Sequence, residues 1–166
     1  AGLIGSHCAV DFTPAAYRLR SISDAGQNLR VNVDNGVSCN DGAINPAGSV
    51  ISAAGYTNND TDAGTGTTLY DIDAASDSLV IQNPPNNGTV AAVGSLNINI
   101  TGVNGFDIFG GSNTALGAFT LDGQNNSRLY SVNLDTGAAA ATPSTAINAG
   151  ANVIGGGEPL KGLTAR

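Results

Sequence analysis

Three short segments with one shared pattern constrain this chain more than any other feature of its sequence. They cover residues 29–36, 69–77 and 129–137, and in each of them apolar or aromatic residues alternate with polar ones before an Asx-rich turn. Alternation with a period of two is typical of a half-buried β-strand, and the turn after it predicts a hairpin. We therefore expect related antiparallel hairpins.

The composition favours the same fold class. Only 11% of the residues are charged, with a single Glu (Glu158) and a single Lys (Lys161), so the residues that usually cover exposed helix faces are nearly absent. The 23 Gly residues, together with many Asn, Asp and Ser, favour tight turns. At 166 residues, the chain is long enough for one domain with its own hydrophobic core.

Further strands are expected between the repeated segments. They cover residues 8–12, 17–22, 37–39, 49–56, 78–82, 89–94, 105–109, 115–121 and 161–165. Residues 138–141 are an apolar run that could start a helix, which Pro143 and the Gly residues at 155–157 would stop.

The spacing of the repeats suggests a particular architecture. Leu69 follows Leu29 by 40 residues and Leu129 follows Leu69 by 60, and a repeat of 40–50 residues with four strands is typical of propeller blades. We expect a single all-β domain over 1–166, a propeller-like array of three to four antiparallel β-sheet blades with units at 8–48, 49–104 and 105–166. Because a closed propeller needs at least about four blades, the array is expected to be incomplete, with exposed edge strands.

The net charge and the hydropathy of the chain argue against two classes of partner, nucleic acid and the membrane interior. A net charge of -7 argues against nucleic acid, which needs clustered Lys and Arg, and no apolar run approaches the length of a membrane span. The chain contains no Met and begins with Ala1, which favours removal of a secretory leader; a trimmed chain is the alternative. In an oxidising compartment Cys8 and Cys39 would form a disulfide, with two separate buried thiols as the alternative.

Few residues suggest a metal or glycan site. Asn58, Asp60 and Asp62 place oxygen ligands at alternate positions, as in a calcium loop, although the glycine and the final Glu of such a loop are missing. A polar surface loop is the better interpretation. Glycosylation sequons begin at Asn59, Asn87, Asn99 and Asn125, a count that chance alone can explain.

Catalytic chemistry has little support. His7 is the single histidine and lies close to the start of the chain, where a third group is poorly placed to hold it. No Cys or His spacing fits zinc or haem, no cofactor is indicated, and a glycosidase pair would have to be two of the Asp residues. Arg18, Arg20 and Arg30 could bind an anion, but bracing a blade is the better interpretation. The acids nearest to them in sequence are Asp11, Asp24 and Asp34.

Two stretches resemble a known family. Residues 10–34, which contain Val10-Asp11-Phe12-Thr13-Pro14 and Arg18-Leu19-Arg20, are similar to a bacterial family of secreted proteins classed as a domain of unknown function, and so are residues 67–89. The resemblance implies a propeller-like β fold outside the cytoplasm and no established activity. Members of that family differ at Thr13 and Tyr17 and have further hairpins before residue 10.

Three functions are compatible with these features. The leading hypothesis is a secreted structural protein whose copies self-associate through β edges into an extracellular filament or surface layer. The first alternative is a propeller-type binding module that recognises a glycan or protein through loops on one face. The third is an enzyme that acts on polysaccharide.

Overall fold

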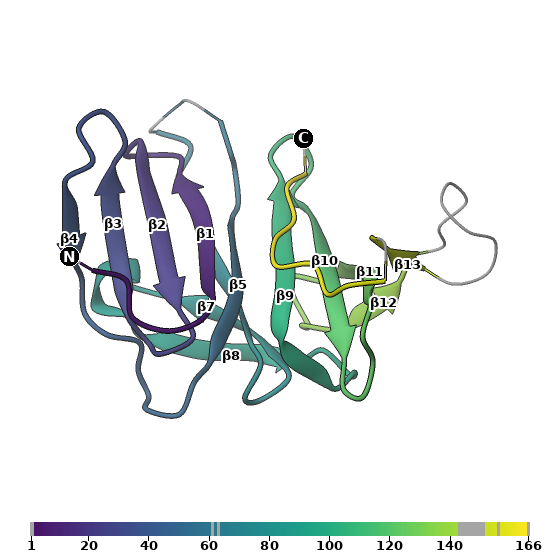
Figure 1. Cartoon of the computed structure of the whole chain (residues 1–166). Helices are drawn as coiled ribbons and strands as arrows, with labels where there is room; N and C mark the ends of the chain where they lie inside the picture. The colour runs from purple at the N-terminus through teal and green to yellow at the C-terminus, as the bar shows by residue number, and fades with distance from the viewer. Residues whose placement is uncertain (1, 61, 63, 143–151, 156, 166) are drawn as a thin grey trace.

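The computed structural model describes residues 2–60, 62, 64–142, 152–155 and 157–165. Within these residues the chain forms 13 β-strands and one short 3-10 helix, η1 (Pro85–Asn87). The strands make three antiparallel sheets (Figure 1), which confirms the all-β prediction. In the described part of the chain, no helix has the length and apolar character needed to cross a membrane.

Each sheet is built on a meander of four strands in which neighbours in sequence are neighbours in space. The first sheet contains β1 (Cys8–Thr13), β2 (Arg18–Ser23), β3 (Asn28–Asn32) and β4 (Ser38–Asn40). The second contains β5 (Ile51–Tyr56), β6 (Leu69–Asp73), β7 (Ser78–Gln82) and β8 (Val90–Ser95). The third contains β9 (Ile100–Phe109), β10 (Thr114–Leu121), β11 (Ser127–Val132) and β12 (Ala139–Ala141), with β13 (Val153–Ile154) also paired to β11.

The second sheet packs against both of the others, and each of its faces buries a separate apolar core. The core shared with the first sheet is built around Ile22 and Tyr56, and the core shared with the third sheet around Ile72 and Phe106. Every residue of β5 is buried as a result. This strand therefore lacks the polar and apolar alternation of a strand with one face in water.

The described sheets do not close on themselves, so the finer prediction of propeller blades is not established by the fold. The repeat is also placed differently from expectation. Residues 69–73 form the second strand of their sheet, whereas residues 29–32 and 129–132 lie in third strands. The third strands begin at Asn28, Ser78 and Ser127, which are 50 and 49 residues apart. The spacing of the sequence repeats is therefore uneven because the second repeat lies in a second strand, whereas the first and third repeats lie in third strands.

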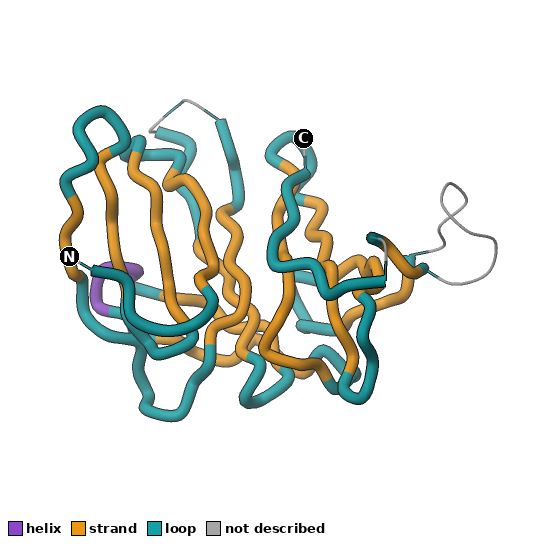
Figure 2. Tube along the Cα trace, in the orientation of Figure 1, coloured by secondary structure: helices purple, strands orange, loops and turns teal. Residues whose placement is uncertain are grey.

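Three further expectations are corrected. Residues 139–141 form β12 rather than a helix, because their backbone pairs with β11. Residues 161–165 form no strand, and Figure 2 shows this segment as a loop that runs beside the third sheet. The predicted boundary at 104/105 lies inside β9, since the turn before the third sheet comes earlier, at residues 96–99.

The expected disulfide is not formed. Cys8 and Cys39 are both free, one in β1 and the other in β4, at opposite edges of the first sheet. Strands in a sheet are about 4.8 Å apart, so the three steps across the sheet alone separate the two Cα atoms by roughly 14 Å, and the register adds an offset along the strands. A disulfide requires Cα atoms within about 7 Å, and therefore the sheet order itself prevents this bond.

Candidate functional site

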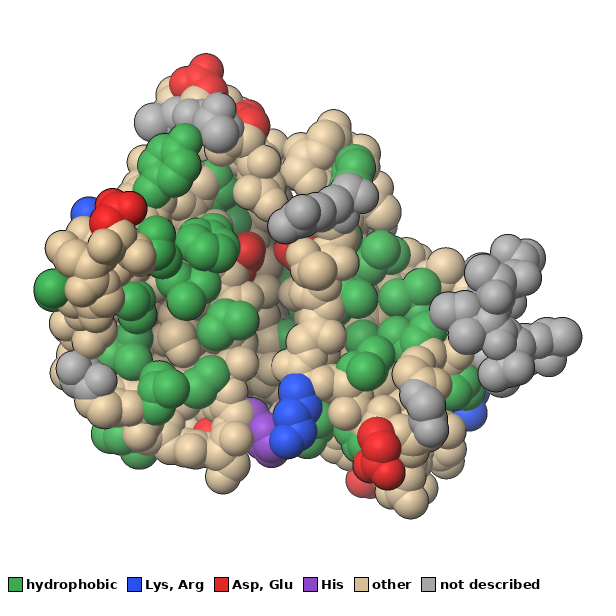
Figure 3. Space-filling view, turned by 45° about the horizontal axis from the view of Figure 1, so that its top comes forward, with side chains coloured by type: hydrophobic (Ala, Val, Ile, Leu, Met, Phe, Trp, Pro, Cys, Tyr) green, Lys and Arg blue, Asp and Glu red, His purple; other side chains and the backbone are tan. Residues whose placement is uncertain are grey.

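A hollow lies between the first and third sheets. Its walls are β1, β5, β9, residues 6–7 and residues 161–165, and we call it the central cleft. It consists of three cavities of about 240, 50 and 330 Å³ that follow one another along β1 and β9. Figure 3 shows acidic side chains within this hollow and the histidine beside a basic side chain at its lower end.

The largest cavity forms an acidic end of the cleft. Asp11 and Asp107 line it from β1 and β9, and Asp60 lines it from the loop after β5. The N–H groups of Tyr56 and Phe12 each donate to Asp11 with N···O distances of 2.7 Å. These bonds fix the Asp11 carboxylate at the point where β1 meets β5.

Asp107 is held in a related way. The N–H of Ile108, the next residue, donates to Asp107 Oδ1 at 2.8 Å, and the N–H of Ala165 donates to Oδ2 at 2.7 Å. In both aspartates, one carboxylate oxygen accepts from the following backbone amide, and the flanking residues are apolar. The second bond of Asp107 also secures the C-terminal segment against β9.

Burial changes the acidity of this end. It raises the pKa of Asp11 to about 6; the Tyr56 N–H opposes that change and the negative charge of Asp107 adds to it. No Lys, Arg or His lines this cavity among the described residues. The acidic end therefore carries negative charge without a cation beside it, and Asp11 changes protonation close to neutral pH.

Two aromatic rings complete the acidic end. Phe12 and Tyr17 line the cavity with 52% and 62% of their surface exposed. Tyr17 lies in the turn between β1 and β2 with a φ of 46°, in the left-handed region that few residues with a Cβ adopt. Exposed rings next to carboxylates suit organic cations or sugar rings.

The opposite end of the cleft has the opposite character. His7, Cys8 and Lys161 line its cavity, together with hydroxyl and amide side chains of Ser52 and Asn104, and no Asp or Glu does so among the described residues. The Asn104 amide donates to Ser52 Oγ at 3.1 Å. Sequence reasoning treated His7 as too near the terminus to be held. The backbone of His7 is fixed, because its carbonyl accepts the N–H of Asp24 at 3.0 Å.

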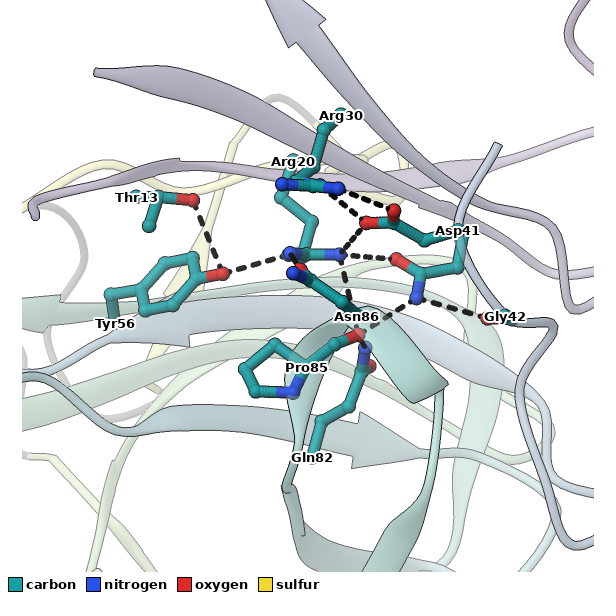
Figure 4. A network of polar contacts seen from close by, with 10 residues as sticks. Thr13, Arg20, Arg30, Asp41, Gly42, Tyr56, Gln82, Pro85 and Asn86 are labelled. Carbon is teal, nitrogen blue, oxygen red and sulfur yellow. Dashed lines mark hydrogen bonds and ion pairs between the residues drawn. The ribbon is translucent and has the colours of Figure 1, made fainter. Parts of the chain in front are cut away.

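The basic residues of the first sheet mostly brace the fold. Arg20 is 2% exposed and donates to Tyr56 Oη at 2.7 Å, so it joins the first sheet to the second (Figure 4). Its other acceptors are Asn28 Oδ1, Asp41 Oδ2, the carbonyl of Pro85 and Asn86 Oδ1. The predicted Arg and Asp network is confirmed for Arg20 and Arg30. Its acid is Asp41 rather than Asp11, Asp24 or Asp34.

Arg18 lies outside this network. Its guanidinium donates to the carbonyl of Tyr17 at 3.1 Å, and it shares a cavity of about 240 Å³ with Arg30, Asn32 and Cys39. The Arg30 guanidinium donates two hydrogen bonds to the Asp41 carboxylate, at 2.6 and 2.8 Å, and this ion pair leaves less of its charge available to an anion. This cavity is therefore a weaker candidate than the central cleft.

The calcium candidates lie in the loop after β5. Asn58 Oδ1 accepts from the Asn113 amide at 2.8 Å. Asp60 and Asp62 each accept a backbone N–H two residues further on, at 2.8 Å. Across the described ranges, no three His, Cys, Asp or Glu side chains gather where a metal ion could sit. The four sequon residues, Asn59, Asn87, Asn99 and Asn125, are all exposed.

Sequence reasoning missed the main residues of the cleft. Asp11, Asp107 and Lys161 belong to distant segments, and only the packing of the sheets brings them to one hollow. One signal was available: Val10-Asp11-Phe12 and Phe106-Asp107-Ile108 both place Asp between apolar residues of a strand. An acid at a position that should be apolar is unusual and marks a site to inspect.

Comparison with known families identifies the chain. Residues 1–155 match the family described as "Domain of unknown function (DUF4394)". The chain belongs to this family. No curated protein and no solved structure matches it. The family match covers nearly the whole chain, and the family description names no activity.

Proposed function

We propose that this member of the family is an extracellular structural protein whose copies associate through an open face of the first sheet, and that its sheets are blades of a propeller-like array. The packing order supports the second part. β1, β5 and β9 are the first strands of the three sheets, and β5 packs beside both β1 and β9. Successive propeller blades place their innermost strands in this way.

The observation that carries the proposal is the outer face of the first sheet. Phe12, Leu19 and Val31 are paired across β1, β2 and β3 and so share the face that points away from the second sheet. On that face Val10 is 55% and Phe12 52% exposed, while Leu19 and Val31 are half-buried. Such a contiguous apolar area on a sheet typically marks an interaction surface.

A second copy is the occupant that we favour. Inside the molecule, sheets already pack face to face twice, and a second copy can repeat that contact. The two ends of the stack differ, because the third sheet presents half-buried Leu116 and Leu129 and is partly crossed by residues 160–165. A contact between unlike ends does not close, so it produces an open-ended filament.

The outer edges of the first and third sheets are less suited to this contact than the sequence suggested. β4 and β12 lie at the outer edges of the first and third sheets and contain three residues each. Short edge strands offer few hydrogen bonds to another chain. The proposed contact is therefore between faces. Covering the half-exposed Val10 and Phe12 would contribute on the order of 1 kcal/mol per side chain.

The experiment is sedimentation velocity over a wide concentration range, with electron microscopy of the same samples. Wild-type protein should associate and form filaments at high concentration, and Val31→Lys should stop both by placing a charge on the open face. The matched control is Val33→Lys, in the exposed turn after β3. Monomer at every concentration, or equal association of the two variants, would refute the proposal.

The extracellular part of the proposal has its own support. All four sequon residues are exposed, and few Lys or Glu residues cover the surface. Intact-mass analysis after secretion from a glycosylating host, with Asn→Gln changes at each sequon, would show which of them carry glycan. An unchanged mass would remove the sequons as support.

A binding module is the second candidate. The central cleft favours it, because exposed aromatic rings, three carboxylates and two basic side chains line one hollow. Polar groups that converge on a cavity are typical of ligand sites. A catalytic version would use Asp11 and Asp107 as acid and base, and loss of a measured polysaccharide hydrolysis in Asp11→Asn would support it.

A further inference from the structure

The two ends of the central cleft carry opposite charges that the protein itself does not neutralise. Asp11, Asp60 and Asp107 line one end, and the positive charge of Lys161 lies at the other, where His7 also lines the cavity. Among the described residues, the ion pairs are those that Asp41 makes with Arg20 and Arg30, and they lie outside the cleft. A metal ion would use only the acidic end and a simple anion only the basic end. A ligand with both charges uses the whole cleft.

The length of the cleft sets the separation of those charges. Asp11 follows Cys8 by three residues along β1, which corresponds to roughly 10 Å at about 3.3 Å per residue. Along β9, Asp107 follows Val103 by four residues, or roughly 13 Å. An extended chain of three residues spans about 10–11 Å. The two charged ends of a tripeptide therefore match the two ends of the cleft.

The middle of the cleft restricts what can lie between the charges. Its cavity is about 50 Å³, and several of the residues that line it are Ala or Gly: Ala9, Ala53, Ala54, Gly105 and Gly162. There is room for a peptide backbone with a small side chain and little room for a large one. Ser52 and Asn104 also line this part, and their polar groups are bonded to each other and to the backbone, so the middle of the cleft selects by size.

We propose that the central cleft binds a short zwitterionic peptide of about three residues with a small central residue. Its α-ammonium group lies between Asp11 and Asp107, against the rings of Phe12 and Tyr17. Its carboxylate lies beside Lys161 and His7. This inference rests on the second proposed function, the binding module. Phe12 lines the cleft and also belongs to the open face of the first sheet, so the two proposals share this side chain.

The test is isothermal titration calorimetry with the tripeptide Ala-Gly-Ala and with its N-acetylated and C-amidated forms. The free tripeptide should bind, and blocking either end should weaken binding at least tenfold. Lys161→Gln should weaken the free and N-acetylated peptides and leave the C-amidated form unchanged. Asp107→Asn should show the opposite pattern. Because Asp107 also holds Ala165, Asp60→Asn in the exposed loop serves as a second variant at the acidic end.

Asp34→Asn, in the exposed turn after β3, is the control and should bind as wild type does. Equal affinity for free and blocked peptides would overturn the charge assignment while leaving a binding cleft in place. Absence of binding to all three peptides at millimolar concentration would overturn both the peptide inference and the binding-module candidate. Binding that Lys161→Gln and both Asp variants leave unchanged would move the site away from the cleft, and this too would overturn the inference.

Discussion

Replacing Arg20 by Met should destabilise this protein more than any other single change in a basic residue. Arg20 is buried and donates to five acceptors on both sides of the contact between the first and second sheets. Met has a similar length but no donor, so Asn28 Oδ1 and Asn86 Oδ1 lose their bonds to the guanidinium. Asp71, fully buried nearby, also loses the positive charge that opposes its desolvation.

The magnitude follows from the burial of these groups. Asp41 keeps its two bonds from Arg30, so the cost comes from buried groups that lose the guanidinium, chiefly Asn28 Oδ1 and Asp71. A buried polar group left without its partner costs about 1–3 kcal/mol and a buried charge costs more, which gives about 3–5 kcal/mol in total. For a chain of this size, each kcal/mol lowers the melting temperature by roughly 2–4 °C. Arg20→Met should therefore melt roughly 6–20 °C below wild type at pH 7, as followed by circular dichroism.

Arg18→Met is the matched control, since it removes the same charge from the same strand. Arg18 is half-buried and bonds to the carbonyl of Tyr17, an exposed contact, so its loss should cost less than about 1 kcal/mol. If the two variants melt within about 3 °C of each other, Arg20 does not brace the sheets in the way proposed here.

Three further predictions concern burial, close packing and thiols. Burial raises the pKa of Asp71, so the contribution of this one group to native stability is largest below about pH 4 and falls as the pH rises towards the native pKa. In urea unfolding, the free energy of unfolding of Asp71→Asn should rise relative to that of wild type between pH 4 and pH 7, by about 1.4 kcal/mol for each unit by which the pKa is raised. A difference between the two proteins that does not change with pH would contradict this. A Cβ on Gly105 would lie 2.5 Å from the carbonyl carbon of Gly162, so Gly105→Ala should push the C-terminal segment away from β9 and speed hydrogen exchange in residues 157–165. Gly102→Ala is the control and should leave this exchange unchanged, because no atom lies within 4 Å of its Cβ. Unreduced native protein should react with two equivalents of a thiol reagent, Cys39 faster than Cys8, and a zero count would show that the cysteines pair.

The sequence by itself determined the secondary structure and most of its boundaries. Segments such as 78–82 and 115–121 were predictable because alternation and turn residues act locally. The same reasoning misplaced residues 139–141, whose run of Ala has no strand preference of its own. Pairing with β11 makes that segment a strand, and pairing is not a local property.

The tertiary structure alone decided the order of the sheets, and with it the candidate site. Asp11 and Asp107 are 96 residues apart in the chain, and they share a cavity because β5 packs beside both β1 and β9. The sequence could not identify the acid that pairs with Arg20 and Arg30 for the same reason. That acid is Asp41, which follows β4, and the path of the chain across the first sheet brings it to both guanidinium groups. Local alternation of polar and apolar residues specifies which residues form strands. Which partner a charged side chain contacts depends on which sheets pack together, and that is set by the tertiary structure.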